Sequence, residues 1–384
     1  MFTKNYTIIS LYSSVFIVIG LLTAYFPLWL NQALKLETHH IGYILSLSGV
    51  LKVIFTLTIT AFIKNGNYLR ASLIFITAFT VTLFLVIYYF KSALPFSLIF
   101  FMVILFLISF SPVLPFIETF YSSLVKKSFE NYGKIRISGS ISFCIAVFLF
   151  GFFFSKFSLT IFPVVLVISL LMIGFSVFMI PSTVGIQKYK NLESYKTFFK
   201  KKNKNLVIIV LACSLLQSTH AMYYAYSTIM WENKGLDFFK VGMLWSFAIA
   251  AEILFFLIID KNFKSNLIYK TLIFCSIASF IRWGLTYLVE NFYILLIVQT
   301  LHGITFALTH YTMIFSINTK LKQSSKLLVQ SVYFTLNGGI FITILTIACG
   351  HLTSYTKEDE GYLLMTLIAF LSLILVYKNR KILK

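Results

Sequence analysis

Residues 182–205 read STVGIQKYKNLESYKTFFKKKNKN, the longest polar stretch in the chain. Apolar runs of about 20 residues flank it on both sides, and each is long enough to cross a bilayer as a helix. Six such runs precede the stretch and six follow it. Because it carries seven lysines, we expect residues 182–205 to be a water-exposed linker. The chain then divides into two six-helix halves, residues 1–181 and 206–384.

Composition agrees with a chain that lies mostly in a membrane. Hydrophobic residues make up 59% of it and charged residues only 11%, which excludes an ordinary soluble domain. The alternating segments of about ten residues that build a spanning β-barrel are absent from the sequence. The sequence therefore predicts an all-α membrane protein with twelve transmembrane helices. We place them at residues 6–30, 41–63, 71–90, 96–121, 135–155, 159–181, 205–231, 239–259, 268–289, 292–317, 327–348 and 362–377.

The positive charges are distributed unevenly over the predicted loops. Of 32 Lys and Arg residues, 23 fall in the termini and loops of one side and six in the loops of the other. Since Lys and Arg accumulate on the cytoplasmic side, we expect both termini and the linker there, in a bacterial inner membrane. The net charge of +20 thus needs no nucleic-acid partner. The cysteines and histidines lack metal-site spacing, so we expect no metal or other cofactor.

Five charged side chains fall inside predicted spans. Each costs at least about 2.5–3.5 kcal/mol at the centre of a membrane helix unless it faces the protein interior. They are Lys52, Glu118, Arg136, Glu252 and Arg282. Three cations against two carboxylates favour an anionic substrate in a polar cavity. Lys52 lies too deep in its span to reach the headgroups, so we expect it to face that cavity.

Histidines and other polar residues follow helical spacing in several spans. His302 shares a face with Gln299 and Thr305, and His220 shares one with Tyr224. Asn337 precedes two glycines in the eleventh span. These residues can line a cavity, or they can join helices structurally as polar contacts. Both interpretations stay open, as does a purely structural pairing of Glu118 with Arg136.

Aromatic residues permit a similar choice between ligand binding and structure. Trp245 precedes Glu252 by two helical turns, and with Tyr224 it can stack on an aromatic ring. Tyr25 and Trp29 lie near the outer end of the first span. We expect these two in the aromatic belt at the membrane surface.

Several motifs in order resemble a known transporter group. Residues 215–235 (LLQSTHAMYYAYSTIMWENKG), 241–256 (VGMLWSFAIAAEILFF), 281–284 (IRWG) and 298–310 (VQTLHGITFALTH) are similar to the second half of the phenylpropionate permease group of the major facilitator superfamily. In the first half, residues 111–118 (SPVLPFIE) and 132–140 (YGKIRISGS) resemble the same group. The resemblance implies a major facilitator fold with its substrate site between the halves.

A more distant similarity is to the lactose permease type of sugar–proton symporter. That resemblance implies that Glu118 and Arg136 bind substrate. It also implies that Glu252, Arg282 and His302 act in affinity and proton coupling. The proton-carrying carboxylate of that type, one turn after the histidine, falls at Thr305 here. The departure leaves the proton site open and argues against galactosides.

We therefore expect a proton-coupled symporter that takes up a small organic anion, with an aromatic acid as the candidate substrate. We expect it to work as a monomer, and we do not expect it to be an enzyme. Glu252 is the first candidate for the coupling proton, with Arg282 as its partner and His302 as second candidate. The residues expected to bind substrate are Lys52, Glu118, Arg136, His220, Tyr224, Trp245 and Asn337. Two alternatives remain: a nucleoside- or sugar-type proton symporter on the same scaffold, and a membrane-embedded lipid-linked transferase.

Overall fold

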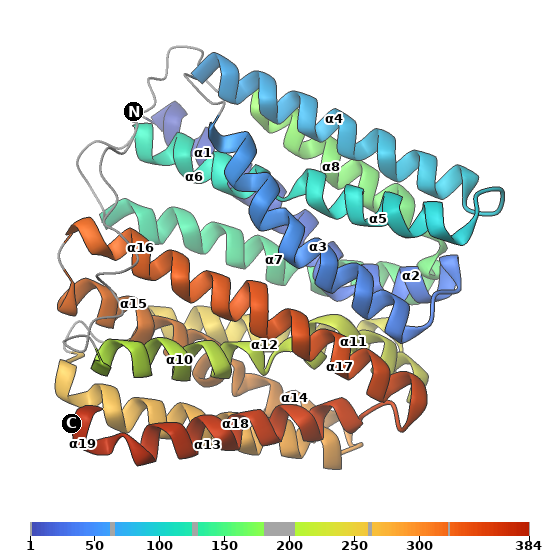
Figure 1. Ribbon diagram of the computed structural model, residues 1–384. Coiled ribbons are helices and arrows are strands. Elements are labelled where there is room, and N and C mark those ends of the chain that lie inside the picture. The colour runs from blue at the N-terminus through green and yellow to red at the C-terminus, as the bar shows by residue number, and fades with distance from the viewer. Residues whose placement is uncertain are drawn as a thin grey trace. The chain divides into compact units, whose positions relative to one another are not determined.

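The computed structural model describes residues 2–61, 66–124, 130–179, 204–259, 263–321 and 323–383. Every regular element in these ranges is a helix (Figure 1). Eleven helices within them are long and apolar enough to cross a membrane. Helix α3 (Thr38–Ala61) occupies the second of the twelve predicted spans. The all-α membrane fold is thus confirmed, while most of the predicted linker lies outside the described residues.

The first half of the chain follows the predicted spans. Its other elements are α1 (Phe2–Ala24), α2 (Phe26–Leu34), α4 (Gly66–Phe90), α5 (Phe96–Phe110), α6 (Val113–Leu124), α7 (Glu130–Phe157), the short 3₁₀ helix η1 (Leu159–Ile161) and α8 (Phe162–Phe178).

The second half is interrupted more often. Its elements are α10 (Lys204–Ser218), α11 (Ala221–Asn233), α12 (Phe238–Ile258), the 3₁₀ helix η3 (Ser265–Leu267), α13 (Ile268–Leu288), α14 (Phe292–Thr300), the π-helix η4 (Gly303–Leu308), α15 (Thr309–Lys320), α16 (Gln323–Phe334), the π-helix η5 (Thr335–Phe341), α17 (Ile342–Tyr355), α18 (Glu360–Lys378) and α19 (Arg380–Leu383).

Prolines explain the interruption of the fourth span. Helix α5 ends at Phe110, and Ser111–Pro112 separates it from α6. Proline lacks the backbone N–H of a helical residue and disfavours helical geometry at the residue before it. The local sequence thus accounts for this break.

The described chain forms two compact units. The first contains Met1–Glu37, Leu47–Lys188 and Trp231–Ser246. The second contains Thr38–Ser46, Tyr189–Met230 and Phe247–Lys384. Each unit therefore includes a short segment from the opposite half of the sequence. The predicted boundaries at 181 and 206 remain a prediction.

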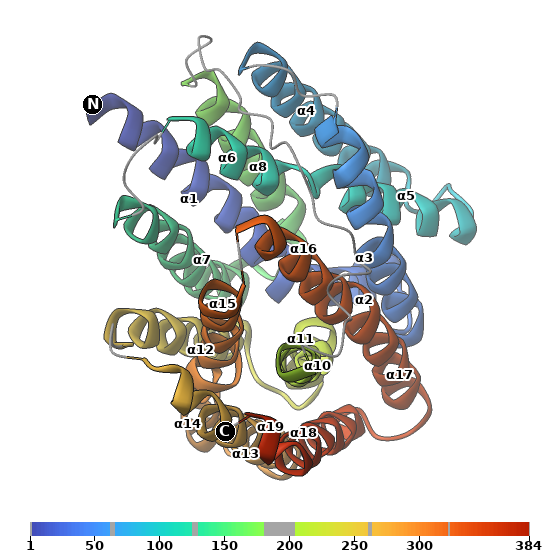
Figure 2. The ribbon, with the colours of Figure 1, turned by 60° about the vertical axis from the view of Figure 1, so that its left-hand side comes forward.

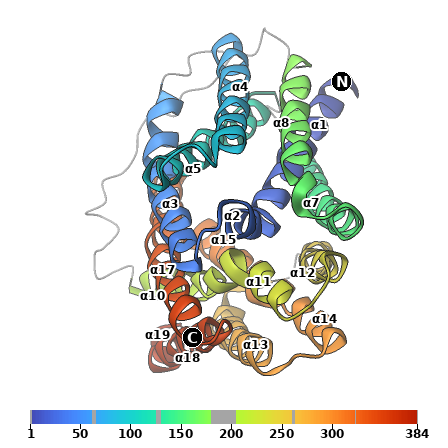
Figure 3. The same cartoon turned by 90° about the vertical axis from the view of Figure 1, so that its right-hand side faces the viewer.

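The first unit has an aromatic core. In it, α1 packs along α7 and α8, and α4 packs against α5 and α8 (Figure 3). Trp29 is buried at 2% exposure, with its ring centroid 5.3 Å from that of Phe84 and 5.6 Å from that of Phe162. Tyr25 is buried as well and donates its hydroxyl to the carbonyl of Val147 at 2.8 Å. The predicted membrane-surface belt for Tyr25 and Trp29 is wrong, because both rings pack inside the unit.

The second unit is organised by helices that are distant in sequence. Helix α13 packs along α18 (Figure 2), and α10 contacts α15, α18 and η5. Helix α10 contributes a run of buried apolar residues to this core, from Leu206 to Cys213, together with Leu272 of α13 and Met313 of α15. This apolar core joins α10, α13 and α15, and α10 and α13 carry polar residues further along their length.

Candidate functional site

Arg282 is the centre of a buried polar cluster in the second unit. It projects from α13 and has 0% exposure. Its Nη1 is 2.9 Å from Nδ1 of His302 and 3.2 Å from Nε2 of His220, and it donates to Oγ1 of Thr305 at 2.8 Å. Its Nη2 donates to Oε1 of Gln299 at 2.8 Å. The structure therefore brings together residues of three spans around one guanidinium.

Two aromatic rings cover the faces of this guanidinium. Its central carbon is 4.3 Å from the ring centroid of Trp283 and 5.0 Å from that of Tyr223. Both distances lie in the range of cation–π attraction, which is strongest where water is excluded. Trp283 is held in turn by a hydrogen bond from its Nε1 to Oγ1 of Thr219 at 2.8 Å. Arg282 is thus fixed both in its plane and above it.

Glu252 joins the cluster through His302. Its Oε2 is 3.6 Å from Nε2 of His302, whose other ring nitrogen faces Arg282. The Glu252 side chain is 14% exposed, whereas His302 is 1% exposed. The sequence predicted a pairing of Glu252 with Arg282, and the structure links these two through the imidazole of His302.

A glycine lets the helix of Glu252 approach His302. A Cβ atom added at Gly303 would lie 2.8 Å from the carbonyl oxygen of Ala251, closer than real side chains come. Ala251 and Glu252 are neighbours on α12, and His302 and Gly303 are neighbours on the facing span. Small residues allow this close contact between membrane helices. Gly303 therefore sets the distance at which the carboxylate of Glu252 meets the imidazole.

Two spans are irregular where they reach the cluster. Thr219 and His220 lie between α10 and α11, and Thr305 lies in the π-helix η4. Gln217 connects the two irregular points, because its Nε2 donates to the carbonyl of Phe306 at 2.9 Å. Single π-helical turns inside α-helices occur often at functional sites. Both irregularities move side chains away from the positions that a regular helix would give them.

Tyr224 and Asn337, both expected to bind substrate, lie in this second unit. The ring of Tyr224 stacks on that of His220 with centroids 5.6 Å apart, and its side chain is partly buried. Asn337 is partly buried in the π-helix η5. His220 itself has 0% exposure.

The remaining predicted site residues belong to the first unit. Lys52 of α3 is exposed, and within the described ranges it has no hydrogen bond or ion pair. Glu118 of α6 is partly buried. Trp245 of α12 is 1% exposed and packs with its ring centroid 6.5 Å from that of Trp231. Arg136 lies on α7, and its side chain is outside the described part of the structure.

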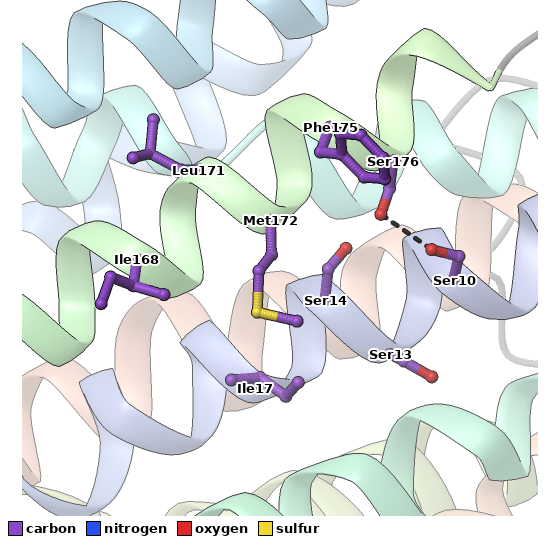
Figure 4. Close-up of a pocket in the computed structure, with 9 residues that line it drawn as sticks. All are labelled: Ser10, Ser13, Ser14, Ile17, Ile168, Leu171, Met172, Phe175 and Ser176. Carbon is purple, nitrogen blue, oxygen red and sulfur yellow. Dashed lines mark hydrogen bonds between the residues drawn. The ribbon is translucent and has the colours of Figure 1, made fainter.

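A groove in the first unit differs in character from the Arg282 cluster. It has a volume of about 420 Å³ and lies between α1 and α8 (Figure 4). Its polar side chains are the hydroxyls of Ser10, Ser13, Ser14 and Ser176, and its apolar rim includes Phe175, which is 71% exposed. None of its lining residues is charged. We therefore place the candidate site at the Arg282 cluster.

Sequence periodicity missed two contributors to this cluster. Tyr223 and Thr219 were not among the predicted site residues, although the first covers Arg282 and the second holds Trp283. Both lie beside predicted residues in the sequence. The break between α10 and α11 changes their direction, and no residue pattern at that point indicates a break.

Comparison with known proteins shows where this arrangement belongs. The model of the MFS_1 like family matches residues 6–360. The chain belongs to this family. The match spans both halves, as expected for a major facilitator transporter, and the family consists of transporters rather than enzymes.

The relatives support the same assignment. The chain is 25% identical over 360 residues to a probable 3-phenylpropionic acid transporter of Escherichia coli (strain K12), with 93% of each chain covered. Among solved structures, the nucleoside transporter NupG has a TM-score of 0.77 at 16% identity, with 99% of each chain covered. A bacterial homolog of the human lysosomal transporter Spinster has a TM-score of 0.71 at 9% identity, covering 98% of this chain and 96% of that one. At these identities the structural likenesses establish the fold alone. The family match and the relative support a multi-pass membrane transporter of small molecules.

Proposed function

We propose that this membrane transporter is a proton-coupled symporter for a small organic anion, with an aromatic acid as substrate. The observation that carries the proposal is the contact of Glu252 with His302, 3.6 Å apart, backed by the Arg282 guanidinium. A titratable carboxylate is costly inside a membrane helix and is generally kept there for a function. In this proposal Glu252 takes up and releases the coupling proton as the protein changes conformation, with His302 as the second candidate.

The substrate class is proposed from charge and from one relative. A relative that covers 93% of this chain is described as a probable transporter of 3-phenylpropionic acid. That acid is an aromatic ring with a carboxylate at the end of a short chain. Fixed cations in the spans outnumber carboxylates by three to two, which favours a substrate carrying negative charge. Uptake of a proton with such an anion also reduces the charge that crosses the membrane.

Individual roles in the proposal follow from side-chain chemistry. Lys52 and Arg136 are assigned to the substrate carboxylate, which a guanidinium can hold through two parallel hydrogen bonds. Glu118 is assigned to pair with Arg136 when no substrate is bound. Tyr224 and Asn337, which are partly buried, are assigned to the aromatic ring of the substrate. His220 and Trp245 are fully buried and are not assigned to it.

Uptake into proteoliposomes tests this proposal. Purified protein is reconstituted, a pH gradient (acid outside) is imposed, and uptake of radiolabelled 3-phenylpropionate is compared with uptake of its neutral amide. We expect the acid to accumulate against its gradient and the amide not to accumulate. A proton ionophore should abolish the accumulation, while uptake down a substrate gradient should persist.

Competition assays separate the related possibilities. Nucleosides and sugars are added in excess to the same uptake assay, and we expect neither to reduce uptake of the aromatic acid. Equal uptake of acid and amide, or inhibition by nucleosides alone, would contradict the proposed substrate class. We also propose that the protein acts as a monomer in the bacterial inner membrane with both termini in the cytoplasm. Protease protection of terminal tags in oriented vesicles tests that orientation.

A further inference from the structure

The hydrogen-bond directions around Arg282 restrict where protons can sit. A guanidinium only donates hydrogen bonds, so every atom that receives one from Arg282 must offer a lone pair. Nη1 carries two hydrogens but has three partners: Thr305 Oγ1 at 2.8 Å, His302 Nδ1 at 2.9 Å and His220 Nε2 at 3.2 Å. The Thr305 hydroxyl is also 3.3 Å from His220 Nε2. All three are satisfied if Nη1 donates to Thr305 and His302 while Thr305 donates to His220.

The other side of His220 agrees with this arrangement. Its Nδ1 is 3.1 Å from the backbone carbonyl oxygen of Gln217, which can only accept. Nδ1 therefore carries the hydrogen and Nε2 carries the lone pair. His220 is neutral in this arrangement, with one defined tautomer.

His302 has the opposite tautomer for the same reason. Its Nδ1 faces Nη1 of Arg282 at 2.9 Å and must be without hydrogen, so its hydrogen is on Nε2, toward Glu252. Adding a proton to His302 would place a hydrogen on Nδ1 against the Arg282 donor. It would also place a second positive charge beside a guanidinium that has 0% exposure. Glu252, by contrast, can accept a proton without disturbing Arg282.

Gln299 and Thr305 hold Arg282 in this position. They lie three residues before and three residues after His302, so one side of the span presents three acceptors to the two amino groups of Arg282. Gln299 Oε1 accepts from Nη2, and Gln299 Nε2 has no hydrogen-bond partner among the described residues. A buried amide whose NH2 group has no acceptor costs free energy. The bond to Arg282 is therefore the role of the Gln299 side chain, which is not a general polar link between helices.

We propose that Gln299 and Thr305 are positioning residues that hold Arg282 on the lone pair of His302, so that His302 stays neutral and Glu252 carries the proton. The inference rests on the proposed proton coupling and names the group that performs it. The titratable and charged groups that face the cluster come from α12, from α11 with the residue before it, and from α18. They are Glu252, His220, Tyr223, Tyr224 and Tyr362. Glu252 is the only carboxylate among them.

Nuclear magnetic resonance of the histidine rings tests the inference without a transport assay. Purified protein labelled with ¹⁵N-histidine is placed in lipid nanodiscs, and the ring nitrogens are observed from about pH 5 to pH 8, the range in which an ordinary histidine titrates. His302→Gln and His220→Gln variants assign the two signals. We expect both rings to stay neutral throughout, with hydrogen on Nε2 of His302 and on Nδ1 of His220.

Isosteric variants then test the two positioning residues. In the double variant Gln299→Met with Thr305→Val, the guanidinium loses two acceptors, and we expect His302 to become an imidazolium within the same pH range. Thr305→Ser keeps the hydroxyl and should behave as the unmodified protein. Thr312→Val is the matched control, because Thr312 is buried in the same span and its hydroxyl donates only to the carbonyl of Leu308 at 2.8 Å.

Three outcomes would overturn the inference. They are an imidazolium signal for His302 in the unmodified protein, hydrogen on its Nδ1, or an unchanged His302 spectrum in the double variant. The pH profile of substrate exchange gives a second measurement, in which the double variant should gain a step that Thr312→Val lacks. Failure of proton-driven uptake in the unmodified protein would contradict the proposed function but would leave the ring-nitrogen result standing. The two failures are therefore distinguishable.

Discussion

Arg282 in the second unit and Lys52 in the first are both cations of predicted membrane spans, yet their surroundings are opposite. Arg282 has 0% exposure, and its amino groups contact four side chains while two rings cover its faces. Lys52 is exposed and has no hydrogen bond or ion pair within the described residues. Substrate binding at Nη1 of Arg282 would require breaking one of its internal hydrogen bonds to His302 or Thr305. We therefore propose that Arg282 acts within the protein interior and that Lys52 contacts the substrate anion.

Replacing Arg282 should have the largest effect. Arg282→Gln removes the donors to His302, Thr305 and Gln299 and leaves buried acceptors unpaired. Breaking such a buried charged network costs about 3–5 kcal/mol. We expect a marked fall in the thermal unfolding midpoint of the purified protein and loss of both accumulation and exchange. Arg282→Lys keeps the charge but loses the planar guanidinium, so its thermal unfolding midpoint should lie between those of the unmodified protein and Arg282→Gln. An unchanged unfolding midpoint for Arg282→Gln would contradict a structural role for Arg282 and the contrast with Lys52.

Replacing Glu252 should affect coupling more than stability. Glu252→Gln keeps the shape of the side chain but cannot release a proton, and its partial exposure limits the structural cost. We expect accumulation against a gradient to be abolished while substrate exchange in counterflow persists. Glu290→Gln is the control, because Glu290 is an exposed loop carboxylate between α13 and α14. Full uphill transport by Glu252→Gln would exclude Glu252 as the proton carrier.

A methyl group at Gly303 should separate two helices of the second unit and so test their contact at Glu252 and His302. Gly303→Ala places Cβ 2.8 Å from the Ala251 carbonyl and forces α12 away from His302. Overpacking of this kind costs about 1–3 kcal/mol. We expect a moderate loss of stability and a larger loss of proton-driven accumulation. At Gly284 of α13 an added Cβ meets nothing closer than 3.9 Å, so Gly284→Ala should change neither quantity.

Replacing Lys52 should have the smallest structural effect. Lys52→Met removes one charged donor from an exposed site, and a hydrogen bond to a charged group is worth about 1.5 kcal/mol or more. We expect the KM for an aromatic acid to rise about tenfold, which corresponds to that energy, while the unfolding midpoint stays the same. Transport kinetics with the acid measure the effect. Lys52→Arg should keep most of the affinity, and an equal KM for all three proteins would assign the anion to another cation.

Much of the fold was predictable because hydropathy is a local property. Apolar runs of the right length predicted membrane helices whether or not their neighbours were known. The charged residues inside those runs singled out Glu252 and Arg282, and the resemblance to the lactose permease type grouped them with His302. The structure brings these three together. The order of contacts was not predictable. His302 lies between Glu252 and Arg282 because Gly303 allows α12 to approach, and this depends on a carbonyl 52 residues earlier in the chain.

Helical periodicity failed where the helices are irregular. The position of Tyr25 and Trp29 near the end of the first span assigned them to the membrane surface, although both pack inside the first unit. Helical periodicity gave no sign of the break before Ala221 or of the π-helix Gly303–Leu308. An irregular turn rotates all later side chains relative to a regular helix. Tyr223 and Thr219 therefore entered the cluster without being expected there.

The sequence by itself determined that the chain is a polytopic helical membrane protein and which side chains are too costly to face lipid. Those properties depend on the transfer free energy of each segment, which its own residues set. Only the tertiary structure decided which of the costly groups are satisfied by one another and which stay available. Arg282 meets residues of spans seven and ten because helices distant in sequence pack around α13. Lys52 stays available because its side chain is exposed on α3.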